Sequence, residues 1–263
     1  MKIGFIGLGN MAGAMIGGLV KSGVAKEAII GFDVLEQVRN KRKEEFGIVL
    51  CNSNEEVAAQ ADYIVLAVKP QYLAPVLAKI DGSLSEEKVI ISIVAGKSLE
   101  FLSSKINGTG KIVRCMPNTA ALVGAAITAV APSANVSKEE LEIAVKIVES
   151  FGKASVVPEH LMDAVTGVSG SSPAYVFMFI EAMADAAVLE GMPRAQAYEF
   201  AANAVYGSAK LMLDTGKHPG ELKDMVCSPA GTTIAGVKEL EDGAFRAVVM
   251  GAVIAAAEKS KEL

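Results

Sequence analysis

The sequence predicts an α/β N-terminal domain with a mostly parallel, doubly wound sheet, followed by an all-α C-terminal domain. Two observations support this fold class. Up to residue 157, short apolar runs rich in β-branched residues alternate with helical patterns, as in the βαβ units of parallel sheets. From residue 158 onward the patterns are helical. We therefore expect one domain over residues 1–157 and a second over residues 158–263.

The strands of the first domain are predicted from its apolar runs. The segments DYIVLAV and KVIISIV are continuously apolar, which is typical of parallel strands covered on both faces. Shorter runs of the same character complete the sheet. The expected strands are residues 2–6, 28–33, 47–50, 62–68, 88–94, 111–115, 125–131 and 154–157.

The helices between these strands are marked by their first residues and by their charge. SNEE at 53–56 and SKEE at 137–140 match capping boxes, in which the Ser and Glu side chains bond backbone amides reciprocally. Residues 36–46 are expected to form a charged surface helix. Its basic segment VRNKRK is followed at once by two Glu residues, a pattern typical of an ordinary solvated helix face.

The C-terminal domain is predicted to contain long, apolar helices. Ser172–Pro173 is expected to cap a helix that runs to Gly191, and two more helices are expected over 193–216 and 244–259. The charged residues of the first are Glu181, Asp185 and Glu190. A helix that is apolar nearly all round must be buried. We therefore expect these helices to interlock with a second copy of the chain in an isologous homodimer.

The composition argues against several classes of protein. With 263 residues and a net charge of −5, the chain lacks the basic stripe of a nucleic-acid-binding protein. Three cysteines without CxxC spacing and two histidines indicate neither a disulfide framework nor a metal site. The longest apolar stretches, such as residues 247–257, are shorter than the roughly 20 residues of a transmembrane helix. We expect a soluble, cytoplasmic protein that binds no nucleic acid, membrane or metal.

A glycine-rich motif predicts where a cofactor binds. GFIGLGNMAGAM contains Gly7-x-Gly9-x-x-Ala12 directly after the first strand and at the start of a helix. In a Rossmann domain the first glycine makes the turn, the second lets backbone approach a pyrophosphate, and the third, small residue lets helix pack on strand. Asp33 would accept hydrogen bonds from an adenosine ribose and repel a 2′-phosphate. We expect NADPH or NADH; a purely structural glycine turn is the alternative.

Further loops extend this edge of the sheet, because ligands of open α/β sheets lie beyond the carboxyl ends of the strands. LAVKP at 66–70 and SIVAG at 92–96 both carry backbone past the expected cofactor. RCMPNTAALVG at 114–124 adds Asn118 and Thr119 to the same rim. For Lys69 within LAVKP, a solvated loop lysine is the alternative.

Five segments are informative together: GFIGLGNMAGAM, LAVKP, RCMPNT, AVTGVSGSSPAY and HPGELKDMVCSPAGTTIAGVKELE. They resemble the pyrroline-5-carboxylate reductase family, and the similarity covers essentially the whole chain. The resemblance implies a Rossmann domain and a helical domain that interlocks two subunits, with further assembly of dimers into a homodecamer. It also implies the last step of proline biosynthesis, the reduction of 1-pyrroline-5-carboxylate to L-proline by NAD(P)H.

The resemblance implies particular site residues as well. Glu159 matches a position near the bound amino acid, and Asn54 matches one that touches the cofactor. Phe32 and Asp33 depart from the segment common in the family, so NADH and NADPH both stay open. The expected cofactor-binding residues are Gly7, Leu8, Gly9, Asn10, Met11, Ala12, Asp33, Asn54, Ala67, Val68, Lys69, Pro70, Ala95 and Gly96.

The polar turn SPAGTT at 228–233 interrupts the helical half and is the expected substrate site. Successive N–H groups at a helix N-terminus bind anions, so the amides of Gly231, Thr232 and Thr233 are expected to hold the substrate carboxylate. The catalytic candidates are Thr233 and Ser228. The Thr233 hydroxyl is a poor general acid, so it would donate a hydrogen bond or relay a proton to the imine nitrogen. For Thr233, a plain helix N-cap is the alternative.

Two other functions stay open. One is a related Rossmann reductase acting on another cyclic imine or on a 3-hydroxyacid. Hydroxyacid members use a catalytic Lys in the early interdomain helix, and AVTGVSGSSPAY contains none. The other is a non-catalytic dinucleotide-sensing protein, which would bind cofactor without turnover and leaves the polar turn unexplained.

Overall fold

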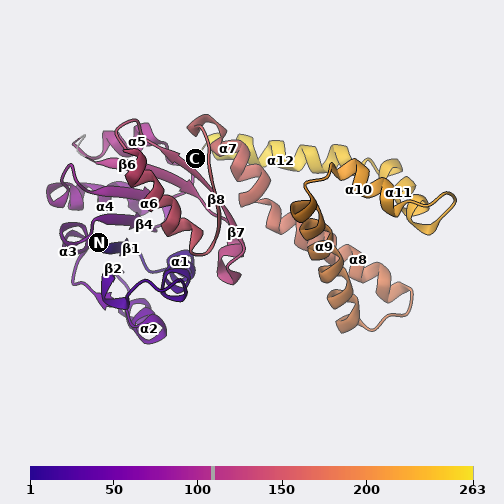
Figure 1. Ribbon diagram of the computed structural model, residues 1–263, viewed down its shortest axis with the longest axis horizontal. Helices are drawn as coiled ribbons and strands as arrows, with labels where there is room; N and C mark the ends of the chain where they lie inside the picture. Colours follow the sequence, from indigo (N-terminus) through magenta and orange to yellow (C-terminus); the bar gives the residue numbers. More distant parts are fainter. Residues whose placement is uncertain (108–109, 263) are drawn as a thin grey trace. The chain divides into compact units, whose positions relative to one another are not determined.

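The computed structural model describes residues 1–107 and 110–262, which form two compact units. The first unit consists of Met1–Ser171 together with Ala255–Leu263, and the second of Ser172–Ile254. Figure 1 shows the sheet in the first unit and long helices in the second. The expected fold class is confirmed. The functional division at residue 157 stays a prediction.

The first unit is built on an eight-stranded sheet, counted over the described residues, in the order β3-β2-β1-β4-β5-β6-β7-β8. Neighbouring strands pair in parallel, apart from the antiparallel pair β6 and β7. This pair reverses because a short 3-10 turn, η3 (Thr119–Val123), joins its strands, whereas a parallel crossover needs about a dozen residues. The strands are β1 (Ile3–Ile6), β2 (Ile29–Phe32), β3 (Val49–Leu50), β4 (Tyr63–Leu66), β5 (Val89–Ser92), β6 (Lys111–Met116), β7 (Ala126–Pro132) and β8 (Gly152–Val156).

Helices cover both faces of this sheet. α1 (Asn10–Lys21) and α6 (Lys138–Glu149) contribute side chains to the core on one face. α3 (Asn54–Gln60) and α4 (Pro70–Ile80) contribute to the core on the other. The remaining elements of this unit are α2 (Glu36–Phe46), α5 (Leu99–Ser104), α7 (Met162–Val165), the 3-10 turns η1 (Lys26–Ala28), η2 (Asp81–Ser83) and η4 (Glu159–Leu161), and the π-helical turn η5 (Thr166–Gly170).

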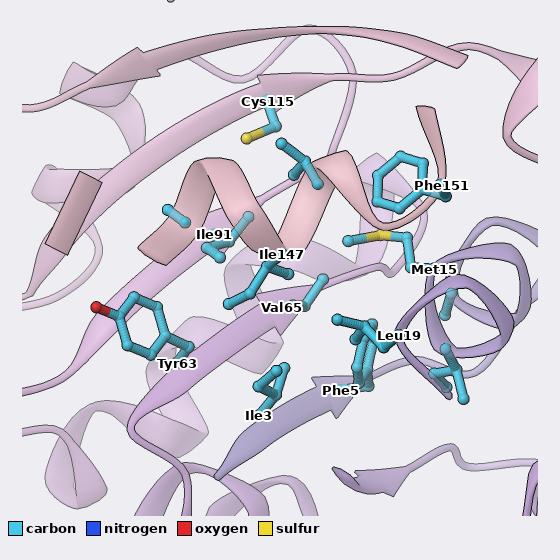
Figure 2. Close-up of a cluster of buried hydrophobic side chains, with 14 of the residues drawn as sticks. Ile3, Phe5, Met15, Leu19, Tyr63, Val65, Ile91, Cys115, Ile147 and Phe151 are labelled. Carbon is cyan, nitrogen blue, oxygen red and sulfur yellow. The ribbon is translucent and has the colours of Figure 1, made fainter. Parts of the chain in front are cut away.

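The two core clusters follow from the alternation of side chains along each strand. Phe5, Val65 and Ile91 point to the face that carries α1 and α6, where Met15 and Ile147 meet them (Figure 2). The neighbouring residues Ile6, Ile64, Leu66 and Ile90 belong to the opposite cluster. Because both faces are buried at β1, β4 and β5, these central strands are apolar over nearly their whole length, as the sequence runs predicted.

One of the two predicted capping boxes forms completely. At α6, Ser137 Oγ accepts from the Glu140 amide, and the Glu140 carboxylate accepts from the Ser137 amide. At α3, Ser53 Oγ accepts from the Glu56 amide, but the Glu56 carboxylate accepts from the Asn52 amide instead. The reciprocal bond predicted for SNEE was therefore wrong, because Asn52 offers both its amide and its side chain to the same carboxylate oxygen.

The second unit consists of helices packed around small residues. Ala184, Ala197 and Ala201 form its buried cluster, where α8 and α9 meet. The expected helix cap at Ser172 was wrong, because Ser171 already has helical backbone angles and donates its amide to Thr166 O at 2.8 Å. The helices are α8 (Ser172–Leu189), α9 (Arg194–Thr215), α10 (Pro219–Val226), α11 (Thr232–Asp242) and α12 (Phe245–Lys261).

Many large apolar side chains of the second unit are exposed in the single chain. Phe177 is 66% exposed, Phe200 65% and Met250 63%. By length and composition alone, the helical run Glu159–Leu189 would qualify as a membrane span, with a mean hydropathy of 1.4 and 6% of its most apolar window buried. The expectation that each apolar stretch is too short to span a bilayer was therefore wrong. This surface needs a covering partner of some kind.

Candidate active site

Two glycines with different structural roles shape the glycine-rich turn between β1 and α1. Gly7 has φ +91°, donates its amide to Phe32 O at 2.9 Å, and leaves no room for a Cβ, which would lie 2.7 Å from Ala67 O. Gly9 is exposed and stands at the N-cap of α1, where it has no side chain to bond the first-turn amides. Those amides, from Asn10, Met11 and Ala12 onward, are free to bind an anion. The turn therefore fits the pyrophosphate of a dinucleotide.

The end of β2 contacts this turn through a carboxylate. Asp33 Oδ2 accepts from the Leu8 amide at 2.8 Å, and Oδ1 accepts from the Leu35 amide at 3.0 Å. Arg39 Nη1 donates to the Asp33 carbonyl at 2.6 Å, and its guanidinium stacks 5.3 Å from the Phe32 ring centroid. Each carboxylate oxygen has a second lone-pair site, so Asp33 can still accept from a ribose hydroxyl.

The other predicted cofactor residues line the same edge of the sheet. β1 pairs in parallel with β4, and β4 with β5, so Ala67 and Val68 after β4 and Ala95 and Gly96 after β5 lie at the sheet edge where the glycine-rich turn leaves β1. Gly96 has φ +71°. Lys69 is exposed at the N-cap of α4, and Pro70 is the first residue of that helix. Asn54 opens α3, which follows the edge strand β3.

Asn118 carries an unsatisfied buried atom at the end of β6. Its Oδ1 is buried and has no hydrogen-bond partner among the described residues. A buried carbonyl oxygen without a donor is costly, so such an atom calls for a partner from outside the chain. Asn118 therefore offers an acceptor to an ordered water or to a ligand N–H.

Glu159 is held in an ion pair that the sequence did not reveal. Its Oε1 accepts from Arg114 Nη1 at 3.0 Å and from the Leu99 amide at 2.6 Å. Arg114 lies on β6 with a side chain 12% exposed, and Leu99 begins α5 directly after the β5 loop. The carboxylate therefore ties that loop to η4. The spacing of 45 residues between Arg114 and Glu159 gives no local signal for this contact.

The polar turn of the second unit brings Ser228 against Gly231. The Gly231 amide donates to Ser228 O at 3.1 Å, and a Cβ on Gly231 would lie 2.3 Å from Ser228 Oγ. Ala230, rather than the glycine, takes the left-handed conformation, with φ 55°. Gly231 is the N-cap of α11, and Thr232 and Thr233 are its first two residues. The alternative of Thr233 as a plain N-cap is therefore wrong.

The cysteines of the first unit are unsuited to nucleophilic chemistry. Burial raises the pKa of the Cys115 thiol to about 12 and also raises the pKa of the Cys51 thiol. At neutral pH both are protonated, and the thiolate is the reactive form. Among the described residues the three cysteines are free thiols.

Comparison with known proteins assigns the chain to a family. Residues 159–263 match the model described as pyrroline-5-carboxylate reductase dimerisation, and residues 2–96 match the one described as NADP oxidoreductase, coenzyme F420-dependent. Pyrroline-5-carboxylate reductase of Escherichia coli (strain K12) is 52% identical over 263 residues, which is 100% of this chain and 98% of the relative. The chain belongs to the pyrroline-5-carboxylate reductase family. The predicted resemblance is confirmed.

Solved pyrroline-5-carboxylate reductases share the fold. The enzyme from Coxiella burnetii matches with a TM-score of 0.94 and 32% identity, covering 99% of this chain and 97% of the other. The enzyme from Plasmodium falciparum, solved with NADP bound, matches with a TM-score of 0.90 and 34% identity, covering 100% and 97%. The predicted fold class and the class of enzyme, an NAD(P)H-dependent reductase, are confirmed. The individual site residues stay predictions.

Proposed function

We propose that this chain reduces 1-pyrroline-5-carboxylate to L-proline with NADPH or NADH, the last step of proline biosynthesis. The observation that carries the proposal is the pairing, within one chain of this family, of two anion-binding turns at helix N-termini. One opens α1 after the glycine-rich turn, and the other opens α11 after SPAGTT. The first suits a dinucleotide pyrophosphate and the second the carboxylate of a small amino acid.

The substrate carboxylate is held by the start of α11. As the first residues of the helix, Thr232 and Thr233 have amides without an intrahelical acceptor. The Gly231 amide is already bonded to Ser228 O, so Gly231 serves chiefly by leaving room for Ser228 Oγ. Ser228 Oγ and the two threonine amides then bind the carboxylate oxygens. Glu159 is retained as a substrate residue on the family resemblance.

Catalysis rests mainly on positioning. A bound dinucleotide would supply a hydride to the imine carbon, and the C=N π electrons would move to the ring nitrogen, which takes up one proton from solvent. Thr233 donates its hydroxyl hydrogen bond to the ring nitrogen, whose basicity increases as the C=N bond is reduced. A hydroxyl is a poor general acid, so most of the rate acceleration comes from holding the imine in a reactive orientation.

Two side chains near the end of β2 bear on the choice between NADPH and NADH. Asp33 favours the two free hydroxyls of an adenosine ribose. Arg39, whose guanidinium bonds the Asp33 carbonyl, offers a positive charge for a 2′-phosphate. We infer that the chain accepts both dinucleotides, with the balance set by these two residues.

The exposed apolar surface of the second unit supports self-association. The match to a dimerisation family covers this unit, and Phe177, Phe200 and Met250 are more than half exposed in the single chain. We propose that a second copy, rather than lipid, covers α8, that the resulting dimers assemble into a homodecamer, and that the enzyme acts in the cytoplasm.

A coupled assay tests the function. Purified protein is mixed with 1-pyrroline-5-carboxylate and NADPH or NADH, and loss of reduced-nicotinamide absorbance is compared with L-proline measured by chromatography. We expect equimolar consumption and formation. Turnover with a 3-hydroxyacid and oxidised dinucleotide, without turnover of the imine, would instead favour a related reductase that acts on a 3-hydroxyacid. Dinucleotide binding without turnover of either substrate would favour a sensing role.

A further inference from the structure

Arg42 stands apart from the other charged residues of α2. Among the residues of α2, all of which are described, Arg42 is the buried one, with 7% of its surface exposed. Lys41 and Lys43, its neighbours, are exposed, as expected of a solvated helix face. The prediction that this basic cluster is a solvated helix face is therefore confirmed for the two lysines and wrong for Arg42. Burying a charged guanidinium costs free energy unless hydrogen bonds and an ion pair compensate, so the contacts of Arg42 are informative.

Those contacts are with the glycine-rich turn. Arg42 Nε donates to Leu8 O at 3.0 Å, and Nη2 donates to Gly9 O at 3.0 Å. Nη1 pairs with Glu45 Oε2 at 2.5 Å, which holds the guanidinium from the side facing solvent. The planar fork of arginine suits two adjacent carbonyl oxygens in a way that a lysine ammonium does not.

Peptide planarity links these bonds to the amides of the turn. In a trans peptide the C=O and the following N–H point in opposite directions. Anchoring Leu8 O toward α2 therefore turns the Gly9 N–H away from it, and anchoring Gly9 O does the same to the Asn10 N–H. The Leu8 N–H itself is occupied by Asp33. Gly9 O also accepts from the Gly13 amide at 2.9 Å, the first backbone bond of α1. The guanidinium thus acts together with the start of α1 in fixing which amides of the turn face outward.

Gly13 is shaped for this arginine. A Cβ on Gly13 would lie 2.4 Å from Arg42 Cζ and 2.6 Å from Nη2, closer than side-chain carbons come to other heavy atoms. Gly13 is inside α1, where glycine costs about 0.5–1 kcal/mol relative to alanine. The helix therefore carries a glycine, at some cost in stability, at the position on which the guanidinium lies.

We propose that Arg42 is a positioning residue for the dinucleotide site. It holds the carbonyls of Leu8 and Gly9 so that the Gly9 and Asn10 amides point toward the pyrophosphate, and Gly13 provides the space that this requires. The inference rests on the proposed function only in that the ligand is a nicotinamide dinucleotide.

Dinucleotide binding tests the role directly. The dissociation constant for NADPH is measured by isothermal titration calorimetry for wild type, Arg42→Met, Arg42→Lys and Lys43→Met, the last a matched removal of charge from the same helix. We expect Arg42→Met to weaken binding about tenfold, since hydrogen bonds from a charged donor are lost, and Lys43→Met to change it less than about twofold. Arg42→Lys should recover only part of the loss. In steady state, the KM for NADPH should rise while kcat and the KM for the imine stay within about twofold.

A double-mutant cycle excludes a merely structural role. Gly13→Ala alone should weaken NADPH binding about tenfold, whereas in an Arg42→Ala background, where the guanidinium is gone, it should change binding less than about twofold. Additive effects would overturn the proposal, as would wild-type affinity in Arg42→Met. If wild type binds NADPH in an Arg42-dependent manner without reducing the imine, the proposed function fails and the inference stands. If no variant or wild type binds a dinucleotide, both fail.

Discussion

The two units of this chain bury their apolar residues in different ways. In the first, large side chains such as Phe5 and Phe151 are 0% and 1% exposed. In the second, the buried cluster consists of three alanines, while Phe177 and Phe200 are 66% and 65% exposed. Burial stabilises by about 25 cal/mol per Å² of apolar surface, and alanine has little to bury. The first unit is therefore stabilised by its own core, whereas the second leaves much of its apolar surface uncovered in the single chain.

This difference divides the proposed site. The dinucleotide turn is fixed by contacts inside the first unit, from Asp33, Arg42 and the strands beside it. The proposed substrate turn lies in the second unit, whose apolar surface we propose that a second copy covers. A change that uncovers that surface should therefore remove the reaction and spare dinucleotide binding.

The largest effect is expected from a charge placed on that surface. Phe177→Glu would force a carboxylate into the proposed subunit interface at a cost of several kcal/mol. We expect the dimer to dissociate, as measured by light scattering, and turnover to fall about a hundredfold or more. The affinity for NADPH should stay within about threefold of wild type. Tyr72→Glu is the matched control, because Tyr72 is 59% exposed on the first unit. A fully active, dimeric Phe177→Glu would contradict the comparison.

The hydroxyl of Thr233 should matter nearly as much and only in the chemical step. Thr233→Val keeps the shape of the side chain and removes the proposed donor to the imine nitrogen. We expect kcat to fall about ten- to hundredfold, because a hydrogen bond to a group that gains basicity is lost, and NADPH affinity to stay unchanged. Thr233→Ser should retain most of the activity. Undiminished turnover in Thr233→Val would remove this residue from the catalytic list.

Gly231 offers a test of the turn geometry without removing a polar group. In Gly231→Ala the new Cβ would lie 2.3 Å from Ser228 Oγ, so the turn must shift. We expect kcat/KM for the imine to fall about tenfold, because small displacements of a bound substrate are costly in rate. Gly236→Ala, in the same helix, has no described atom within 4 Å of the new Cβ and should leave kcat/KM unchanged. Equal effects of the two substitutions would show that the turn does not hold substrate.

Substitution of Asp33 tests the proposed dinucleotide site of the first unit. Asp33→Ala removes both the partner of the Leu8 amide and the negative charge that opposes a 2′-phosphate. We expect the ratio of kcat/KM for NADPH over NADH to rise about tenfold, with most of the change in KM. Asp33→Asn, which keeps an acceptor for Leu8, separates the charge effect from the turn effect. An unchanged ratio in both variants would mean that Asp33 does not read the ribose.

The sequence was a good guide wherever structure is set by neighbouring residues. Apolar runs predicted the strands because both faces of a parallel sheet are buried. Gly7-x-Gly9-x-x-Ala12 predicted a strand, a tight turn and a helix start, because only glycine tolerates the φ of +91° at position 7. The antiparallel direction of β7 was harder to predict from the sequence, since the connection before it had to be recognised as too short for a parallel crossover.

The sequence was a poor guide to contacts between distant segments. Nothing in VRNKRK distinguishes Arg42 from the lysines beside it, because its burial depends on how α2 lies against α1. The Arg114–Glu159 pair joins a strand to a turn 45 residues away. In SPAGTT the glycine attracts attention as the flexible residue, yet it is Ala230 that has the positive φ, and Gly231 is required for its missing side chain.

Ala230 therefore gives the smallest and most local test. An alanine at φ 55° is strained by roughly 1–2 kcal/mol relative to glycine in the same conformation. Glycine also increases the entropy of the unfolded chain, which offsets about 0.5–1 kcal/mol of that gain. We expect Ala230→Gly to raise the free energy of unfolding by about 0.5 kcal/mol, measured by urea denaturation at fixed protein concentration. Ala235→Gly, within α11, should lower it by about 0.5–1 kcal/mol. If Ala230→Gly and Ala235→Gly both lowered the free energy of unfolding, Ala230 would not be strained in its left-handed conformation. Gly231 alone would then determine the shape of the turn.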